Sequence, residues 1–242
     1  MHCFYIEPPE GDEAHLLPEE SRHAIRVLRL QPGDGLCAMD GAGRRWRAEI
    51  LYAGEDGVRV RLSEPLPSGE PSVRVTVYQG LPKADKLDFI AQKLTELGTA
   101  ALVPVKMERC VVKLDRRDGQ KRRDRLEKIA REAAKQCRRA LPLEISEPLS
   151  WPQVLERMQS HDLVLVPWED AAGRRMRDAW EAHPDAKDIG IVVGSEGGMS
   201  EAEVRALTDA GALTVTLGPR ILRTETAAVV ATALAMQLWG DI

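Results

Sequence analysis

The sequence lacks the features that mark several common classes of protein. No apolar run among its 242 residues approaches the roughly 18 residues that span a bilayer. The first residues, MHCFYIEPPEGDE, are acidic and lack the basic and then apolar order of a signal peptide. The four cysteines are scattered, without a C-x-x-C pair or a histidine cluster, which disfavours a zinc site and a disulfide framework. We therefore expect a cytoplasmic protein with no membrane association and no metal.

The glycine motifs most often associated with nucleotides are also missing. The glycine-rich stretch GSEGGMS, residues 194–200, is not a P-loop, because no Lys-Ser or Lys-Thr pair follows the glycines. The first strand pattern of the α/β region is followed by YQGLPKADK, which lacks the G-x-G-x-x-G fingerprint of an NAD-type Rossmann enzyme. That class of enzyme is therefore disfavoured.

Charge is distributed unevenly along the chain. The formal net charge is −4, which argues mildly against a nucleic-acid partner. Residues 1–72 carry eight Lys and Arg against thirteen Asp and Glu, whereas residues 106–139 carry fourteen against six. The basic block is either an electrostatic footprint for phosphate or a solvated helix face with ion pairs between neighbouring turns. Charge alone leaves both interpretations open.

Residues 1–70 have the pattern of a small β domain. Strand-like runs at 2–6, 35–40, 44–53 and 57–63 accompany one helical pattern at 18–30. DGAG, residues 40–43, has the composition of a hairpin loop. One helix among several short strands predicts a small barrel. SEPLPSGEPS, residues 63–72, is rich in Pro, Ser and Gly and predicts a linker.

Residues 73–242 alternate between strand and helix patterns, which predicts a mostly parallel sheet covered by helices on both faces. A basic helix is predicted over 124–140, and Ser200 with Glu203 forms a predicted capping box. The helix predicted over 84–98 ends at Gly98 and carries an apolar stripe of Leu87, Ile90, Ala91, Leu94 and Leu97.

The ends of three predicted strands carry unusual residues, and ligands of open α/β sheets bind beyond the carboxyl ends of the strands. LVPWED, residues 165–170, ends one strand but is a weak signal alone. IVVGSEGGMS, residues 191–200, combines glycines that admit a ligand close to the backbone with Glu196, whose charge suits a cationic ligand. LGPRILRTETA, residues 217–227, places Arg220 and Arg223 before a helix predicted to be capped by Thr224, although the helix macrodipole disfavours cations there.

These segments resemble the bacterial 16S ribosomal RNA uracil-N3 methyltransferases of the RsmE type, in the SPOUT class. GSEGGMSEAE and, about twenty residues on, LGPRILRTETAAV carry the resemblance, with SRHAIRVLRLQPGD, KADKLDFIAQKLTELG, ERCVVK and EAAKQCRR in support. Ser195 stands where the family usually has proline, Cys110 stands for serine, and Cys137-Arg138 replaces Ser-Gly. None of these departures removes a group that we assign to catalysis.

The resemblance implies a fold, a cofactor and a partner subunit. It implies a SPOUT methyltransferase domain over 73–242, mostly parallel and threaded as a trefoil knot, and a PUA-like β-barrel over 1–70 that helps to hold RNA. It also implies S-adenosylmethionine as the methyl donor and a homodimer whose active sites combine residues of both subunits. The implied reaction is methylation of N3 of one uridine in the decoding region of 16S rRNA in the small subunit.

The resemblance also implies roles for individual residues. Arg220 and Arg223 are expected to face the uracil or RNA phosphate, and Glu196 either lies near the cationic methionine end of the donor or assists removal of the N3 proton. The donor is expected to be held by Pro167, Gly194, Glu196, Gly197, Gly198, Leu217, Gly218, Ile221, Leu222 and Thr226.

RNA is expected to be held by basic residues of both domains, which position RNA rather than read its sequence. The predicted contacts are Arg22, His23, Arg26, Arg29, Arg44, Arg45, Arg47, Lys121, Arg122, Arg123, Arg138 and Arg139. His23 is equally compatible with a packed helix residue. The alternatives to the implied function are a SPOUT enzyme acting on transfer RNA or another ribosomal site, and a non-catalytic RNA-binding or assembly protein.

Overall fold

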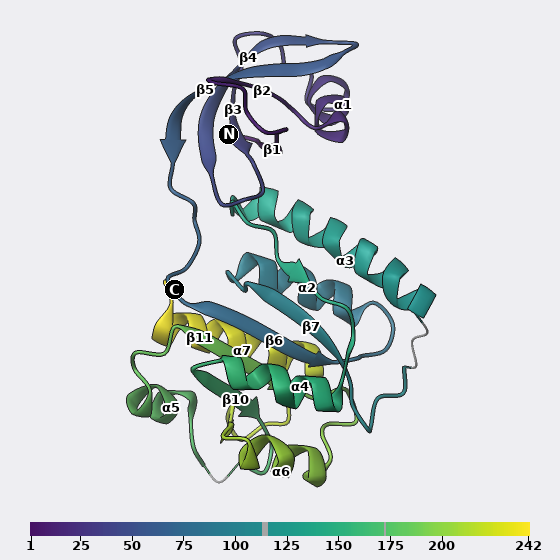
Figure 1. Cartoon of the computed structure of the whole chain (residues 1–242), viewed down its shortest axis with the longest axis vertical. Coiled ribbons are helices and arrows are strands. Elements are labelled where there is room, and N and C mark those ends of the chain that lie inside the picture. The colour runs from purple at the N-terminus through teal and green to yellow at the C-terminus, as the bar shows by residue number, and fades with distance from the viewer. Residues whose placement is uncertain (113–115, 172) are drawn as a thin grey trace. The chain divides into compact units, whose positions relative to one another are not determined.

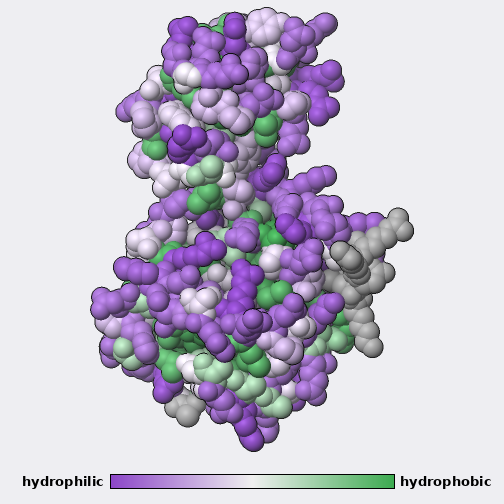
Figure 2. All heavy atoms as spheres, in the orientation of Figure 1, coloured by the Kyte–Doolittle hydropathy of each residue, from purple (hydrophilic) through white to green (hydrophobic). Residues whose placement is uncertain are grey.

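A computed structural model describes residues 1–112, 116–171 and 173–242 and divides the chain into two compact units (Figure 1). The barrel unit comprises Met1–Glu70 and Ala134–Pro142. The sheet unit comprises Pro71–Ala133 and Leu143–Ile242. Hydrophilic side chains dominate the face of each unit that Figure 2 shows, and apolar residues appear there as separate spots.

Five short strands form the barrel unit in the order β1-β3-β4-β5-β2. β1 runs parallel to β3, and the remaining neighbours are antiparallel. A bridge between Ile6 and Leu16 joins the two ends of this order, so the sheet closes into the small barrel that the sequence predicts. The strands are β1 (Cys3–Tyr5), β2 (Glu13–His15), β3 (Gly35–Met39), β4 (Arg45–Gly54) and β5 (Gly57–Leu66).

Helix α1 (Pro18–Arg26) is shorter than the helix predicted over 18–30. It begins with Pro18 in the first turn, where the missing N–H costs nothing. Arg29 adopts a left-handed φ of 53°, and the N–H of Leu30 returns to the carbonyl of Ala24. Leu28 and Leu30 therefore pack against the barrel core after the helix has ended, whereas Val27, which the helical pattern also places on the apolar stripe, is exposed.

Residues 134–142 belong to the barrel unit because polar contacts hold them there. The guanidinium group of Arg139 is buried and pairs with Glu70 at 2.7 Å. The N–H of Ala140 donates to the carbonyl of Ser68 at 3.1 Å, and Arg45 donates to the carbonyl of Arg138. Two of the arginines predicted to contact RNA, Arg45 and Arg139, thus hydrogen-bond within this unit.

The sheet unit contains the mostly parallel sheet that the alternating pattern predicts. Its strand order is β12-β10-β11-β6-β7-β8, with β9 paired to β7, and every neighbouring pair is parallel. The strands are β6 (Arg74–Gly80), β7 (Ala101–Lys106), β8 (Glu144–Ile145), β9 (Leu149–Ser150), β10 (Leu163–Pro167), β11 (Asp188–Val193) and β12 (Leu213–Val215).

Helices cover both faces of this sheet because its strands are apolar on both sides. Val75 and Val77 of β6 pack among residues of α2 (Lys86–Glu96), α3 (Arg116–Cys137), α5 (Met176–Ala182) and α7 (Thr224–Trp239). Tyr78 faces the other way, toward α4 (Trp151–Arg157), the 3-10 turn η1 (Met158–Ser160) and α6 (Glu201–Asp209). In Figure 1, α4 and α6 lie on the near side of the sheet and α7 on the far side.

Local signals in the sequence match several helices of this unit. Leu87, Ile90, Ala91 and Leu94 are buried as the stripe predicts, whereas Leu97 is half-buried. The capping box of α6 is present, because the N–H of Ser200 donates to Glu203 at 2.9 Å and the N–H of Glu203 donates back at 3.3 Å. Within the described residues, no helix is both long and apolar enough to cross a membrane.

Two helix starts differ from the expectation. The basic helix predicted over 124–140 begins at Arg116 in the structure. The sequence did not reveal this start because the first two turns are too polar to show an apolar stripe. The last helix begins at Thr224 with Arg223 as its N-cap, so Thr224 is not the cap that the sequence predicts. The hydroxyl of Thr224 is instead engaged by other segments. The trefoil knot stays a prediction.

Candidate active site

A cavity of about 490 Å³ lies at the carboxyl ends of β10, β11 and β12, which are neighbours in the sheet. Its walls are Pro167 and Trp168 at the end of β10, residues 193–199 at the end of β11, and residues of the segment 216–227 after β12. Parallel neighbours end at the same edge, so three loops that are distant in sequence converge here. We call this the strand-end cavity.

The cavity gathers the predicted catalytic and donor-binding residues, with one exception. Thr226 is exposed in the first turn of α7 and does not line it. The predicted residues that line the cavity are Pro167, Gly194, Glu196, Gly197, Gly198, Leu217, Gly218, Arg220, Ile221, Leu222 and Arg223.

Gly194 and Gly198 of the GSEGG loop are glycines for two different structural reasons. A Cβ atom on Gly194 would lie 2.9 Å from the carbonyl carbon of Gly198, because the loop turns tightly on itself. The N–H of Gly198 closes this turn by donating to Ser195 at 2.9 Å. Gly198 has a φ of +70°, a conformation that residues with a side chain rarely adopt. No other atom lies within 4 Å of the position that a Cβ would take, so there is open space beside it. Gly198 fits the expectation of space for a ligand, whereas Gly194 has a packing role.

Glu196, in the same loop, is held by the start of α2. Its Oε1 atom accepts the backbone N–H of Lys83 at 3.0 Å and lies 3.0 Å from Nζ of Lys86. Burial of this carboxylate opposes ionisation, but Lys86 and the Lys83 N–H outweigh it and hold the pKa of Glu196 below its usual value. Nζ of Lys86 also lies 3.3 Å from Oε2 of Glu225 in α7. Lys86 thus joins the carboxylate of Glu196, which lines the cavity, to the carboxylate of Glu225 in α7.

Lys86 lines the cavity, but the motif analysis did not single it out. It is the first residue of α2, where the helix macrodipole disfavours a cation. The same electrostatic argument draws attention to Arg220 and Arg223 before α7. A cation at the start of a predicted helix is therefore a signal that could have identified Lys86 from the sequence.

Gln79 and Thr224 form a second group that the sequence did not reveal. Both are buried, and Nε2 of Gln79 donates to Oγ1 of Thr224 at 2.8 Å and to the carbonyl of Gly194 at 3.2 Å. The Thr224 hydroxyl donates to the same carbonyl at 2.5 Å. The end of β6, the start of the GSEGG loop and the first residue of α7 are therefore fastened at one point beneath the cavity.

Arg220 and Arg223 are exposed and line the cavity from the segment before α7. Neither forms an ion pair in the parts of the chain that the structure describes. Their guanidinium groups are thus available to an anionic ligand or to RNA, which is consistent with the expectation from the sequence.

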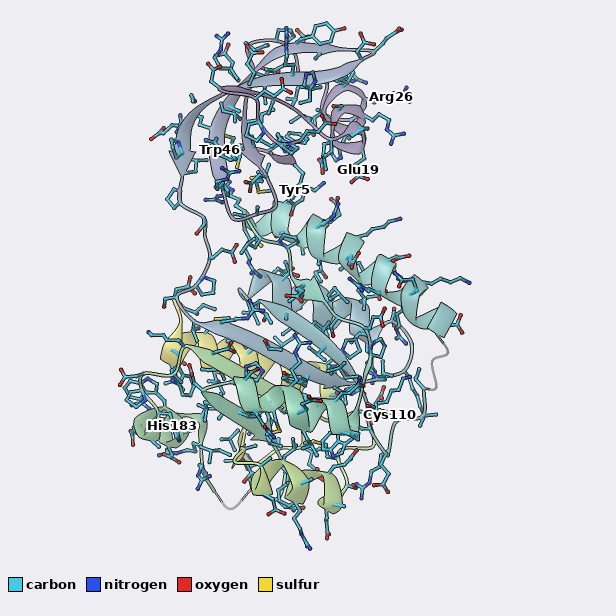
Figure 3. The ribbon with its side chains drawn as sticks, in the orientation of Figure 1. Tyr5, Glu19, Arg26, Trp46, Cys110 and His183 are labelled. Carbon is cyan, nitrogen blue, oxygen red and sulfur yellow. The ribbon has the colours of Figure 1, made fainter. Side chains whose placement is uncertain are left out.

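The predicted RNA contacts of the barrel unit differ in accessibility. Arg22, His23, Arg26 and Arg29 are exposed on and just after α1, and Figure 3 shows Arg26 extending away from the strands. The ring of His23 also meets Phe4 edge-on, with centroids 6.3 Å apart, so this histidine packs as well as faces solvent.

The remaining predicted contacts are largely engaged in local interactions. Arg44 pairs with Asp40 at 2.6 Å and lies over the ring of Trp46. Arg122 donates to the carbonyl of Ala84 at 2.8 Å, and Arg123 pairs with Glu127 at 2.8 Å. The exposed members of the set are Arg44, Arg47, Lys121 and Arg138, of which Arg47 also lies 3.5 Å from Glu64 in an exposed ion pair.

Comparison with known proteins gives this arrangement a family. A model of the RNA methyltransferase domain matches residues 69–236, and a model of the RNA methyltransferase PUA domain matches residues 16–63. The first match contains every residue that lines the strand-end cavity. The chain belongs to this RNA methyltransferase family.

The methyltransferase is similar over nearly its whole length to named relatives. Ribosomal RNA small subunit methyltransferase E of Bacillus subtilis is 38% identical over 237 residues, which cover 94% of this chain and 93% of that one. The protein of the same name from Mycobacterium tuberculosis is 37% identical over 234 residues, covering 94% and 88%. The family resemblance inferred from the sequence is confirmed.

Solved structures match the methyltransferase in fold as well. A ribosomal RNA small subunit methyltransferase E from Neisseria gonorrhoeae, bound to S-adenosyl methionine, has a TM-score of 0.87 and 29% identity, covering 100% of this chain and 99% of that one. A methyltransferase from Legionella pneumophila in complex with the same cofactor has a TM-score of 0.87 and 30% identity over 100% and 99% of the chains. Both proteins hold this cofactor within the fold that the present methyltransferase shares.

Proposed function

We propose that this methyltransferase transfers the methyl group of S-adenosylmethionine to N3 of a uridine in the decoding region of 16S rRNA in the small subunit. The observation that carries the proposal is the strand-end cavity, which is built from the two most family-specific motifs of the sequence, GSEGGMS and LGPRILRTETA. The relatives from Bacillus subtilis, Mycobacterium tuberculosis and Neisseria gonorrhoeae are named as small-subunit ribosomal RNA methyltransferases.

The cavity suits the proposed donor in size and charge. Its volume of about 490 Å³ lies in the usual range for sites that bind small molecules and cofactors. The carboxylate of Glu196 lies at the wall, where its negative charge complements a sulfonium cation. The backbone and apolar side chains around Leu217 and Leu222 provide a surface for adenosine. When bound, the donor supplies an already reactive methyl group, so the protein needs neither a nucleophilic side chain nor a metal.

The two arginines before α7 support the acceptor. N3 lies on the Watson–Crick edge and carries a proton, so the uridine must be unpaired or flipped before it can react. Negative charge develops on the uracil as this proton leaves, and fixed donors in the site stabilise such charge. Arg220 and Arg223 line the cavity and keep their charge at any physiological pH, which supports this role.

Glu196 has an electrostatic role in this proposal. Of the two roles that the sequence leaves open, removal of the N3 proton needs a carboxylate that readily accepts a proton. The contacts of Glu196 with Lys86 and Lys83 lower its pKa and make it a poor base. These contacts support the alternative, in which the Glu196 carboxylate stays ionised near the cationic end of the donor.

RNA is bound by exposed cations of each unit through phosphate contacts. In the barrel unit we propose Arg22, Arg26, Arg29 and Arg47, together with Arg138. Arg45 and Arg139 are left out of this set because their guanidinium groups bind carbonyls and a carboxylate of the protein. In the sheet unit, Lys121 is the exposed candidate at the start of α3.

We further propose that the methyltransferase is a cytoplasmic homodimer. Ile221 supports a partner near the active site, because this large apolar side chain is 83% exposed at the cavity. A second subunit covering Ile221 would complete the site. Light scattering should then give twice the mass of the chain, and a monomer at all concentrations would refute the dimer. The proposed ribosomal RNA substrate supports a cytoplasmic location.

The decisive experiment is methylation in vitro with the product nucleoside identified. Unmodified 16S rRNA, assembled small subunits and total transfer RNA are each incubated with the protein and labelled S-adenosylmethionine, then digested to nucleosides. We expect 3-methyluridine from 16S rRNA or small subunits only. A different methylated nucleoside would overturn the N3 assignment, label in transfer RNA would favour the other substrate, and donor binding without transfer to any RNA would favour the non-catalytic alternative.

A further inference from the structure

Two cysteines of the barrel unit lie directly opposite each other. Cys3 is the first residue of β1, and its partner in the parallel register with β3 is Cys37. Neighbouring strands are about 4.8 Å apart, which falls within the Cα separation of about 4.4–6.8 Å that disulfides span. The cysteine pair therefore needs no large backbone movement to become bonded.

Both side chains point to the same face of the barrel sheet. Cys37 is buried with Tyr5 and Met39 in a small apolar cluster, and the half-buried Cys3 packs against that cluster. Tyr5, labelled in Figure 3, marks the position of this cluster in the barrel unit. Cys3 is partly accessible to a small reagent, whereas Cys37 is buried.

The two thiols already interact, and their surroundings make them unequal. A hydrogen bond between the Cys3 and Cys37 side chains, with the nearby cations Arg45 and Arg138, lowers the pKa of Cys3 to about 7 against the opposing effect of burial. The same bond and burial raise the pKa of Cys37. A substantial fraction of Cys3 is therefore thiolate at neutral pH, and thiolate is the reactive form.

The other two cysteines lack this arrangement. Cys110 lies in a loop and donates weakly to the carbonyl of Val105 at 3.7 Å. Cys137 ends α3 and donates to the carbonyl of Ala134 at 3.7 Å. Neither is in register with another cysteine on a neighbouring strand, so they serve as internal controls.

We propose that Cys3 and Cys37 are a site of reversible oxidation, at which a peroxide converts the pair into an intrachain disulfide between β1 and β3. In the first step the Cys3 thiolate attacks one oxygen of hydrogen peroxide, the O–O bond breaks, and Cys3 sulfenic acid and hydroxide form. In the second step the Cys37 sulfur attacks the Cys3 sulfur, the S–O bond breaks, and the hydroxyl leaves as water with the Cys37 proton. Two thiols and one peroxide thus give one disulfide and two waters, and a reducing dithiol reverses the change.

The disulfide between Cys3 and Cys37 would lie next to the point where the barrel closes. β1 pairs with β3 on one side, and the residue after it, Ile6, forms the bridge to Leu16 that closes the barrel. A covalent link at Cys3 holds this strand in place and restricts the unfolded chain, so the barrel unit becomes more resistant to unfolding. The inference concerns the barrel unit alone and is independent of the reaction at the strand-end cavity.

The test uses the full-length reduced protein. It is treated with hydrogen peroxide near neutral pH, the remaining thiols are blocked with N-ethylmaleimide, and intact mass and non-reducing peptide maps are recorded. We expect loss of two hydrogen masses, two fewer blocked thiols and a linked peptide pair containing Cys3 and Cys37, all reversed by dithiothreitol. Over-oxidation of Cys3 with no linked peptide, or a linkage that uses Cys110 or Cys137, would overturn the proposal.

Variants separate the two chemical steps. Cys37→Ser should stop at the sulfenic acid of Cys3, which a dimedone label detects, whereas the double variant Cys110→Ser, Cys137→Ser should form the linkage as the wild type does. The rate of alkylation of Cys3 in the wild type should rise with pH around a midpoint near 7, and Cys37→Ala, which removes the hydrogen-bonding side chain, should move this midpoint upward. If Cys37→Ser does not fold, the alkylation profile and the peptide map of the wild type still decide the matter, and an unperturbed thiol midpoint contradicts the proposed activation.

Discussion

Nζ of Lys86 lies 3.0 Å from Oε1 of Glu196, so the first residue of α2 holds the glycine loop that follows β11. β6, which precedes Lys86, is the neighbour of β11 in the sheet, and this adjacency brings the two side chains together. The contact fixes one wall of the strand-end cavity and keeps Glu196 ionised. Lys86 is thus a positioning residue for the proposed methyl transfer.

Lys86→Met should weaken donor binding and lower kcat/KM on the order of tenfold or more, because small displacements of groups that align the reactants have large kinetic effects. Isothermal titration with S-adenosylmethionine and initial rates on 16S rRNA measure the two effects. Lys93→Met is the matched control, since Lys93 is on the same helix and pairs with Glu96 at 2.8 Å but does not line the cavity. Equal effects of both variants would show that α2 stability, and not the Glu196 contact, is responsible.

The pH dependence of catalysis distinguishes the two roles of Glu196. Its pKa is lowered in the folded protein, so the stabilisation from its ionised form is complete above the usual carboxyl pKa and is lost only as pH falls through the lowered value. Glu196→Gln should therefore reduce kcat/KM by the same factor across the neutral and alkaline range. Loss of an ascending limb near neutral pH in this variant would identify Glu196 as the base instead.

Gly198→Val should abolish donor binding, because its side chain would enter open space at the cavity. The left-handed backbone adds a strain of about 1–3 kcal/mol, measured by denaturant unfolding. Gly211→Val provides the control, since Gly211 has a φ of +96°, has no other atom within 4 Å of its virtual Cβ and does not line the cavity. The two variants should unfold alike, and only Gly198→Val should fail to bind S-adenosylmethionine. Normal donor affinity in Gly198→Val would refute the placement of the donor.

Arg220→Ala should lower methyl transfer by about 10²- to 10³-fold, as loss of a donor to a developing anion does. Donor affinity should stay within a few-fold of the wild type, because the arginine is proposed to face the uracil. Single-turnover rates and donor titration test both parts, and Arg205→Ala on the exposed surface of α6 serves as the control. A large loss of donor affinity in Arg220→Ala would contradict the role proposed for this residue.

RNA affinity should fall steeply as salt increases, since each phosphate contact releases counterions. Arg26→Ala should lower the slope of log affinity against log salt by somewhat less than about one unit. Filter binding or fluorescence anisotropy with a 16S rRNA fragment measures the slope, with Arg205→Ala again as the reference. A slope that is flat in the wild type would remove the basis for the proposed phosphate contacts.

Features encoded within a few residues could be predicted from the sequence. The stripe of α2, the capping box at Ser200 and Glu203, and the alternating strand patterns depend on local periodicity, and the structure shows them where expected. The glycine and arginine motifs identified the cavity because each is concentrated in one loop. The family resemblance added the cofactor and the reaction, which periodicity alone does not contain.

Contacts between distant segments could not be predicted in this way. Gln79 has no unusual neighbours in the sequence, and its role follows only from its bonds to Gly194 and Thr224. Arg139 sits in a basic run that favours an RNA contact, yet its partner Glu70 is 69 residues away. Thr224 is a residue type that often caps helices, but its hydroxyl donates to the carbonyl of Gly194 in another loop, and this bond determines its position.

The hydrogen bonds that converge on Gly194 and Thr224 constrain the order of assembly. They join segments 115 and 145 residues apart to Gln79, and one of their members begins the last helix of the chain. A polypeptide emerging from the ribosome can pair β6 with β7 early. The strand-end cavity stays incomplete until α7 has left the exit tunnel and docked. Competence for methyl transfer therefore arises only after residues 224–239 have been synthesised and docked, and a chain that stops before α7 gains none of it.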